Sequence, residues 1–298
     1  MTDGRFAAGK FATSQCLLGA HLSIAGGLEK ALYRAAALEC SALQIFTKNA
    51  STWKERSLKE AEIDLFHTAR AETGIRAVAA HTSYLINIAT PDRKQRARSC
   101  AALEKEVMRA TALQISDVVL HPGSHMGFGE SLGLEKAAES LNAVLSKQPR
   151  PTARILLETT AGQGNSLGYR FEQIAALIDR VEDKSKIGVC LDTAHLYAAG
   201  YDIRTVATFS EVLRRFDTAV GFNYLKLLHL NDSKKDLGMR VDRHEHIGEG
   251  FIGLEAFRFV MQDSRLAAIP KIIETPKDAQ RQDWDRKNLD RLRALLAD

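Results

Sequence analysis

The sequence predicts an α/β protein of the (β/α)8, or TIM-barrel, class. Eight short runs are apolar almost without interruption, as in strands that are covered on both faces of a parallel sheet. A longer stretch follows each run, and its apolar residues recur every three or four positions, which indicates an amphipathic helix. The two patterns alternate along all 298 residues, a length that single barrels commonly reach. A doubly wound open sheet is the alternative arrangement.

The expected strands are rich in Val, Ile and Leu and begin with CLLGAHLS. In chain order they occupy residues 16–23, 42–47, 77–84, 117–123, 154–160, 187–195, 225–232 and 271–276. The expected helices occupy residues 27–39, 58–72, 96–113, 134–147, 170–183, 209–220, 254–263 and 284–297. The longest connection from a strand to a helix is the seventh, from Ser233 to about Gly250, and a loop of that length is often functional.

Composition indicates an ordinary globular chain, with 45% hydrophobic and 26% charged residues. The net charge of +4 is compatible with a polyanionic partner but does not require one. The four cysteines are scattered without a CxxC pair, which favours a reducing compartment over a disulfide framework. Residues 1–14 lack a long apolar run and are expected to form a loose extension rather than a signal peptide, before one barrel domain over residues 15–298. No apolar segment approaches ~20 residues, so no transmembrane helix is expected.

Histidine and acidic residues gather where the third to eighth strands end and on the loops that follow. Active sites of barrels lie at these strand ends. Of the nine histidines in the chain, only His67 is expected away from this rim, on the helical surface. The candidate metal ligands at the rim are His81, His121, Glu158, Asp192, His195, His229, Asp242, His244 and Glu274.

Each of these residues has an ordinary alternative, because a single histidine at a strand end is usually structural and a single acid can cap a helix. The stretch VDRHEH (241–246) taken alone is typical of a solvated loop. Nine such groups on one rim are harder to explain, because burying them without partners costs free energy. Imidazoles and carboxylates suit zinc, manganese or iron, and nine exceed what one tetrahedral ion needs. The residues therefore predict a multinuclear metallohydrolase, for which a phosphate ester is a fitting substrate.

Several motifs carry a resemblance to a known family. They are GAHLSIAGGL (19–28), IFTKN (45–49), HTSYLIN (81–87), LHPGSH (120–125), LETTAGQGNSLG (157–168), GVCLDTAHLYAAGYD (188–202), LHLNDSK (228–234), VDRHEHIGEGFIG (241–253) and IIETP (272–276). At these motifs the sequence resembles the endonuclease IV family of apurinic/apyrimidinic (AP) endonucleases. The order LDTAH, HLNDSK, VDRHEHIGEG is highly specific, and the resemblance spans nearly the whole chain.

The resemblance implies a TIM barrel with three zinc ions (Zn2+), one of which manganese (Mn2+) can replace. By position it assigns ligands to a first ion (His81, His121, Glu158), a second (Glu158, Asp192, His229, Glu274) and a third (His195, Asp242, His244). Glu158 would bridge the first two ions, and Glu158 and Glu274 would be catalytic because they orient the attacking hydroxide. Glu245 and His246 are expected to be solvated or to support the ligands.

The implied reaction is hydrolysis of the DNA backbone on the 5′ side of an abasic site, which leaves a 3′-hydroxyl and a 5′-deoxyribose phosphate. Removal of blocked 3′ ends is the companion activity of the family. The implied partner is double-stranded DNA that contains abasic sites or blocked 3′ ends. A cytoplasmic monomer that acts on nucleoid DNA is expected.

Five residues are predicted to contact the DNA: Tyr84, Leu85, Lys48, Asn49 and Trp53. Tyr84 and Leu85 directly follow the third strand and could insert into the gap left by a missing base, as apolar wedges do. Lys48, Asn49 and Trp53 lie on the second loop, beside the expected groove. Core packing is the alternative for Tyr84, Leu85 and Trp53.

One position departs from the family pattern. Some members carry an arginine on the second loop that enters the DNA stack, and Ser51 stands at the corresponding position. The departure puts this insertion contact in doubt, with Lys54 or Arg56 as potential substitutes, but leaves the chemistry unaffected.

Three rival functions remain open. A metal-dependent sugar isomerase or epimerase would also place His, Asp and Glu at strand ends, but usually needs one or two ions. A non-catalytic binder of damaged DNA would retain abasic DNA without cutting it. A lyase would need a Schiff-base lysine, for which Lys48 is the nearest candidate.

Overall fold

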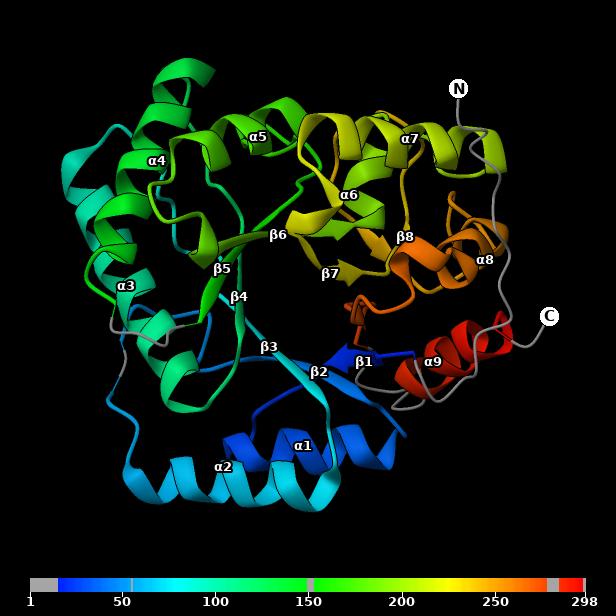
Figure 1. Cartoon of the computed structure of the whole chain (residues 1–298), viewed down its shortest axis with the longest axis horizontal. Coiled ribbons are helices and arrows are strands. Elements are labelled where there is room, and N and C mark those ends of the chain that lie inside the picture. Colours follow the sequence, from blue (N-terminus) through cyan, green and yellow to red (C-terminus); the bar gives the residue numbers. More distant parts are fainter. Residues whose placement is uncertain (1–15, 55, 149–152, 278–283, 297–298) are drawn as a thin grey trace.

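Eight parallel strands close into a barrel in the computed structural model, which describes residues 16–54, 56–148, 153–277 and 284–296. The barrel strands are β1 (Leu18–His21), β2 (Ala42–Phe46), β3 (Ala77–His81), β4 (Asp117–Leu120), β5 (Arg154–Glu158), β6 (Ile187–Asp192), β7 (Leu225–His229) and β10 (Lys271–Ile273). Their order around the barrel is β1-β10-β7-β6-β5-β4-β3-β2 (Figure 1). Pairing of β1 with β10 completes the ring, so the (β/α)8 prediction is confirmed and the open sheet is excluded.

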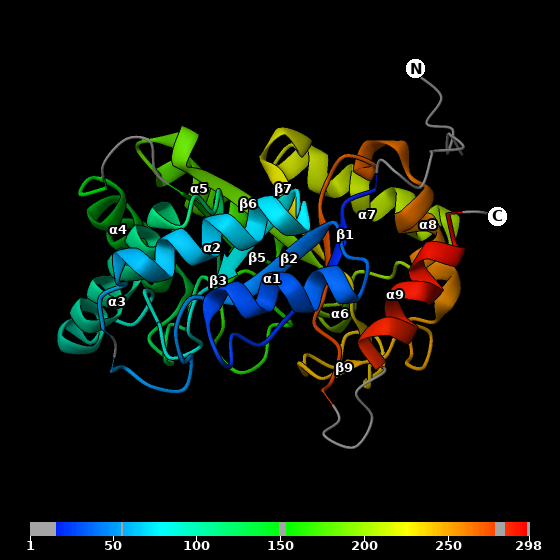
Figure 2. The ribbon, with the colours of Figure 1, turned by 90° about the horizontal axis from the view of Figure 1, so that it is seen from below.

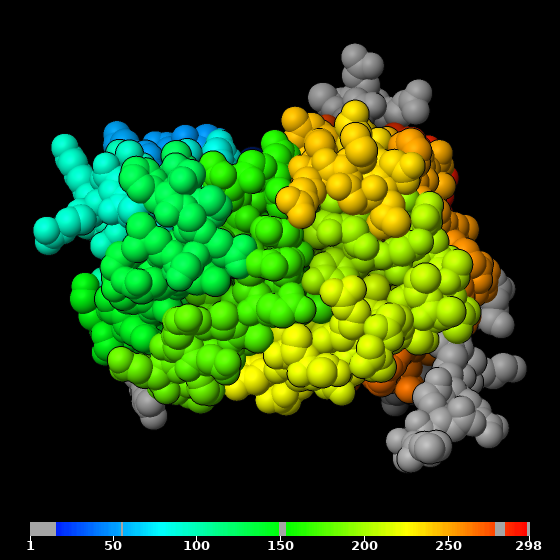
Figure 3. All heavy atoms as spheres, turned by 90° about the horizontal axis from the view of Figure 1, so that it is seen from above, coloured from blue at the N-terminus to red at the C-terminus, as the bar shows by residue number. Residues whose placement is uncertain are grey.

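Helices surround the barrel in chain order. They are α1 (Leu28–Ala37), α2 (Glu60–Thr73), α3 (Arg93–Ala112), α4 (Glu130–Leu145), α5 (Phe171–Arg180), α6 (Thr193–Ala198), α7 (Val206–Ala219), α8 (Leu254–Gln262) and α9 (Trp284–Ala294). Short 3₁₀ helices at Lys184–Lys186, Phe222–Tyr224 and Ser264–Leu266 precede β6, β7 and β10. Helices α1 and α2 lie side by side in Figures 1 and 2, and Figure 3 shows atoms of the α4–α7 region forming a continuous outer surface.

Two apolar clusters fill the molecule on either side of the strands. The larger cluster lies between strands and helices and includes Leu43, Val118 and Leu157. The smaller cluster takes one residue from each of seven strands: Ala42, Ala79, Val119, Leu156, Cys190, Leu227 and Ile272. Because successive strand residues point to opposite faces, the second cluster occupies the barrel interior. None of the described helices is long and apolar enough to cross a membrane.

All eight predicted strands end one to three residues earlier in the structure, and the environment of His67 also differs from its prediction. The sixth strand ends at Asp192, and residues expected to continue it form α6, because the Asp192 carboxylate accepts a hydrogen bond from the His195 backbone N–H (2.8 Å) and caps the helix. His67, expected on the surface, is half-buried on α2. The expected N-terminal extension, residues 1–14, lies outside the described residues.

The seventh loop is ordered by a short antiparallel ribbon and a buried carboxylate. The ribbon pairs β8 (Asp232–Ser233) with β9 (His244–Glu245), which lies at the lower edge of the barrel in Figure 2. Asp232 is fully buried and accepts backbone N–H bonds from Gly248 (2.9 Å), Gly250 (3.1 Å) and Ile252 (2.9 Å). A Cβ atom at Gly250 would lie 2.5 Å from Asp232 Oδ1, so only glycine permits this approach.

We predict that Asp232→Asn loosens the seventh loop, because an amide group cannot accept all of these N–H bonds. The free energy of unfolding should fall by about 2 kcal/mol, and the amides of Gly248 and Gly250 should exchange faster with solvent. Denaturant titration and hydrogen exchange measure both effects. Asp290→Asn, at a side chain that is 57% exposed on α9, is the control. Unchanged protection of the loop in Asp232→Asn would contradict the assignment.

Candidate metal centre

The two-residue period of the strands places the predicted ligands directly above the interior cluster. His81 lies two residues after Ala79, and Glu158 lies two residues after Leu156. The same spacing relates His121 to Val119, Asp192 to Cys190, His229 to Leu227 and Glu274 to Ile272. Side chains two apart share a face, so these six groups point into the barrel mouth. This is where the sequence prediction expected them.

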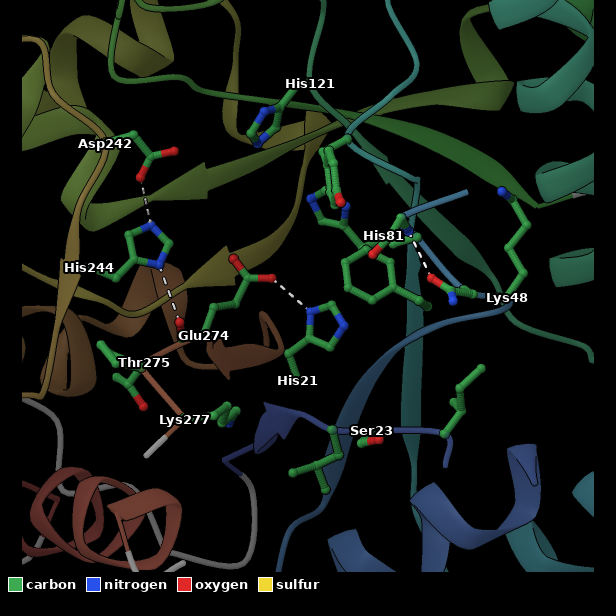
Figure 4. Close-up of a pocket in the computed structure, with 18 of the residues that line it drawn as sticks. His21, Ser23, Lys48, His81, His121, Asp242, His244, Glu274, Thr275 and Lys277 are labelled. Atoms are coloured by element: carbon green, nitrogen blue, oxygen red, sulfur yellow. Dashed lines mark hydrogen bonds and ion pairs between the residues drawn. The ribbon is translucent and has the colours of Figure 1, made fainter. Parts of the chain in front are cut away.

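The structure brings all nine predicted ligands together at this mouth. Four groups have ligand atoms within 4.8 Å of one another: His81–His121–Glu158, Glu158–Asp192–His229–Glu274, Asp192–His195–His244 and Glu158–Cys190–His229. A cavity of about 710 Å³ opens over them. Figure 4 shows His81, His121, Asp242, His244 and Glu274 directed toward a common space.

Glu158 is the centre of the cluster and is fully buried. Its Oε2 lies 3.0 Å from His81 Nε2 and 3.0 Å from His121 Nε2. Its Oε1 lies 2.9 Å from His229 Nδ1. Since the two oxygens face different sets of imidazoles, the carboxylate is oriented as a bridge between two groups of ligands.

Asp242 comes from the seventh loop and meets two imidazoles. Its Oδ2 lies 3.2 Å from His195 Nε2, and its Oδ1 lies 3.3 Å from His244 Nε2. Both nitrogens are buried and have no hydrogen-bond partner among the described residues. Buried nitrogens that face a carboxylate without a hydrogen bond to it fit a cation between them, which favours a ligand role over a solvated loop for this part of VDRHEH.

Backbone carbonyls fix the tautomer of two of the predicted imidazole ligands. His81 Nδ1 donates to Thr82 O at 2.7 Å, and His195 Nδ1 donates to Thr159 O at 2.7 Å. A carbonyl accepts only, so each neutral ring carries its proton on Nδ1 and turns an Nε2 lone pair toward the centre. Such contacts are the usual support for metal-bound histidine.

The charges of the cluster stabilise one another. Burial opposes ionisation of Glu158, but His121 and His229 outweigh it and hold the pKa of Glu158 well below its usual range. Burial likewise opposes protonation of His195, yet Asp192 and Asp242 raise the pKa of that imidazole well above its ordinary value. Burial raises the pKa of Cys190 to about 12, so its thiol stays protonated. The donor set is therefore imidazole and carboxylate, as zinc and manganese accept.

Three polar residues in contact with the predicted ligands were missing from the predicted ligand set, and two of them, Asn231 and Gln44, are fully buried. Asn231 donates to Asp192 Oδ2 (2.6 Å) and accepts from the Glu274 backbone N–H (2.7 Å). His21 and Gln44 contact Glu274. Gln44 had a readable signal, since it is the one polar residue in ALQIF, and His21 ends β1 at the same rim.

Tyr84 and Leu85 lie at a turn on the edge of the cavity. Tyr84 is 68% exposed and lines the cavity, and Leu85 is half-buried. Ser83 holds the turn because its hydroxyl donates to Ala50 O (2.5 Å) and accepts from the Leu85 N–H (3.3 Å). Core packing does not account for so exposed an aromatic ring.

The second loop carries the other predicted DNA contacts in different environments. Lys48 is nearly buried, its ammonium donates to Thr52 O (2.9 Å), and in Figure 4 it points away from the histidines. Asn49 is exposed, and its Oδ1 accepts from the Ser51 N–H (2.9 Å). Trp53 is half-buried, with the Arg98 guanidinium 4.2 Å from its ring centre. Lys48 therefore braces this loop, while Asn49 and Ser51 present their side chains to the cavity.

The two predicted substitutes for a missing arginine also lie on this loop. Arg56 is paired with Glu62 at 2.5 Å, while Lys54 is exposed. Both line a second cavity of about 360 Å³ beside the first, so neither side chain borders the metal centre itself.

Comparisons with known proteins agree with this geometry. The family described as xylose isomerase-like TIM barrel matches residues 32–295. A probable endonuclease 4 of Geobacter sulfurreducens is 46% identical over 279 residues, 94% of each chain. The crystal structure of endonuclease IV from Thermus thermophilus matches with a TM-score of 0.81 and 37% identity, covering 94% of this chain and 98% of that one. A D-tagatose 3-epimerase-like protein matches at a TM-score of 0.72 but only 17% identity, covering 94% of this chain and 98% of that one, which shows the shared fold alone. With its barrel, its converging ligands and these relatives, the chain belongs to the endonuclease IV family of apurinic/apyrimidinic endonucleases.

Proposed function

We propose that this protein is a metal-dependent DNA repair enzyme that hydrolyses the phosphodiester on the 5′ side of an abasic site. The products would be a 3′-hydroxyl and a 5′-deoxyribose phosphate, and the same centre would remove blocked 3′ ends. The convergence of all nine predicted side chains at one barrel mouth, in a chain of this family, carries the proposal. The enzyme would act as a monomer on nucleoid DNA in the cytoplasm.

The donor set supports three ions, zinc in each site or manganese in one. The ligands would be His81, His121 and Glu158 for the first, Glu158, Asp192, His229 and Glu274 for the second, and His195, Asp242 and His244 for the third. When bound, such ions activate water near neutral pH and stabilise the charge of the attacking and leaving oxygens. Every one of these side chains lies in or beside a ligand group of the structure.

The chain's own groups would orient the reactants. Glu274 lines the cavity and shares a ligand group with the buried Glu158, and their carboxylate oxygens would accept hydrogen bonds from the attacking water and orient it toward the phosphorus. Tyr84 and Leu85 would enter the gap at the abasic site, because a missing base lowers the cost of unstacking. Asn49 would contact the backbone, and Lys48 and Trp53 would support that loop.

The rival functions have less support. An epimerase is favoured only by fold likeness at low identity. A binder without activity does not require a bridging carboxylate among four imidazoles. A Schiff-base lyase needs a lysine with a free amine, whereas the Lys48 ammonium donates to Thr52 O and lies 3.8 Å from Glu106 Oε1.

The deciding experiment uses duplex DNA with one tetrahydrofuran abasic analogue and purified protein without added metal. The analogue has no aldehyde, so a Schiff-base lyase cannot cut it. A single 5′ incision with an extendable 3′-hydroxyl is expected. Absence of incision after zinc and manganese are restored would exclude the proposed function.

We predict that Glu158→Gln lowers the incision rate at least about a hundredfold while the fold persists, because an amide turns an N–H group toward one set of imidazoles. The same incision assay and circular dichroism measure both quantities. Glu255→Gln, at a 62% exposed side chain on α8, should cut normally. Near-normal turnover in Glu158→Gln would refute the bridging role.

Metal affinity should fall on acidification. The pKa of His195 and His229 is raised well above the ordinary value in the metal-free protein, so these rings hold protons at neutral pH that an ion must displace. Affinity should decrease about tenfold per pH unit for each displaced proton between pH 8 and pH 6. Zinc titration at several pH values, with a dye that reports proton release, tests this. A flat pH response without proton release would contradict it.

We expect Tyr84→Ala to weaken binding to abasic duplex about tenfold, since stacking of one aromatic ring on a base contributes about 1–3 kcal/mol. The bound metal content should not change, because Tyr84 contacts none of the ligands. Fluorescence anisotropy and elemental analysis give the two values. Tyr33→Ala, at a 41% exposed ring on α1, is the matched control. Equal loss of DNA and metal would instead indicate a structural role.

A further inference from the structure

We propose that Gln44 and His21 are positioning residues that orient the second ion's ligands His229 and Glu274. The proposal deepens the metal-dependent function above and rests on the same centre. Neither residue belongs to the nine predicted ligands. They act from β2 and β1, on the side of the barrel that supplies none of those ligands.

Gln44 occupies a position that apolar residues would otherwise fill. It is fully buried in the middle of β2, between Leu43 and Ile45. Ala42, two residues earlier, belongs to the interior cluster, so Gln44 faces the barrel interior just below the metal centre. A buried amide costs free energy unless its donors and acceptor are all used, which directs attention to its partners.

Each end of the Gln44 amide contacts a different ligand. Its Nε2 donates to Glu274 Oε1 at 2.6 Å, and its Oε1 lies 2.8 Å from His229 Nε2. The reverse orientation of the amide would place its oxygen against the ionised Glu274 carboxylate, which only accepts hydrogen bonds. The orientation of Gln44 is therefore fixed by charge.

This orientation of the Gln44 amide determines which nitrogen of the His229 ring carries the proton. Because the Gln44 oxygen can only accept, His229 Nε2 must carry a proton. In the neutral ring Nδ1 is then left with a lone pair, and Nδ1 is the atom that faces Glu158 Oε1 (2.9 Å) and Glu274 Oε2 (3.2 Å). The side chain of Gln44 thus turns His229 into a ligand through Nδ1, whereas backbone carbonyls leave His81 and His195 to bind through Nε2.

His21 gives Glu274 a second donor. The pairing of β1 with β2 places His21, the last residue of β1, beside Gln44. His21 Nδ1 lies 2.9 Å from Glu274 Oε1 (Figure 4) and 3.0 Å from Gln44 Nε2, which donates to the same carboxylate oxygen. Because an ionised carboxylate can only accept, the His21 proton belongs on Nδ1 and is donated to Glu274. With Oε1 held by two donors, Oε2 remains directed at His229 and the second ligand group.

Gln44 and His21 would therefore act together on the binding of the second ion, although neither residue would contact that ion. Outer contacts of this kind typically change metal affinity by about 10- to 100-fold. A role limited to packing would need the volume of Gln44 but not its polarity. Replacing the amide by a side chain of similar shape separates the two roles.

The experiment measures metal directly, in the full-length protein without DNA. Gln44→Met keeps the side-chain volume and removes both hydrogen bonds. His21→Leu removes the donor to Glu274, and His21→Asn restores a donor near the position of Nδ1. Gln148→Met makes the same chemical change as Gln44→Met at a buried glutamine next to α4, whose Nε2 lies 3.5 Å from Val144 O.

Competition with a chelator should show one ion bound about 10- to 100-fold more weakly in Gln44→Met and His21→Leu. The cobalt-substituted proteins should show an altered visible absorption spectrum, because the geometry of one ion changes. His21→Asn should recover most of the affinity, and Gln148→Met should match the unmodified protein.

Unchanged metal retention and an unchanged cobalt spectrum in Gln44→Met would overturn the proposal. If Gln44→Met does not fold, the comparison of His21→Leu with His21→Asn still tests the proposal. An equal loss of metal affinity in these two variants would overturn the proposal. The outcome is independent of catalysis. Weaker retention in a protein that never cuts abasic DNA would sustain the positioning role and reject the proposed function.

Discussion

The buried negative charge of Glu158 is the constraint on which the centre depends. The carboxylate is fully removed from solvent, and an unpaired ion in that place would be strongly destabilising. Imidazoles from β3, the loop after β4, α6 and β7 surround it, so four separate strand–helix units must converge for the charge to be compensated. The site can therefore assemble only when the barrel closes correctly.

The same groups serve two states of the protein. Without ions, protonated imidazoles balance the carboxylates, as the raised pKa of His195 and the lowered pKa of Glu274 indicate. With ions, the metal charge would replace those protons. Contacts behind the ligands hold the rings and carboxylates in place in either state, through the carbonyls of Thr82 and Thr159 and the side chains of Gln44 and Asn231.

The chemistry and the proposed recognition of DNA sit on different kinds of structure. Four predicted ligands end barrel strands whose register is fixed by the barrel and two more directly follow a strand, whereas Tyr84 and Asn49 lie on the loops beyond it. Loops tolerate substitution more readily than strand ends. Such an arrangement is consistent with Ser51 on the second loop, where the resemblance led us to expect an arginine in some family members, beside a complete set of predicted ligands.

The sequence by itself determined the fold class and the nine candidate ligands at one rim, because strand periodicity and the C-terminal rim of a barrel are local or general rules that a single chain displays. It did not reveal that α6 begins directly after Asp192. The apolar strand pattern continues through LDTAH, but the hydrogen bond from the His195 N–H to the Asp192 carboxylate starts a helix there. Only the tertiary structure decided the partners of Gln44 and Asp232. Their contacts join segments far apart in the chain, Gln44 with Glu274 and Asp232 with Gly248, and such pairings depend on barrel closure, which no local pattern encodes.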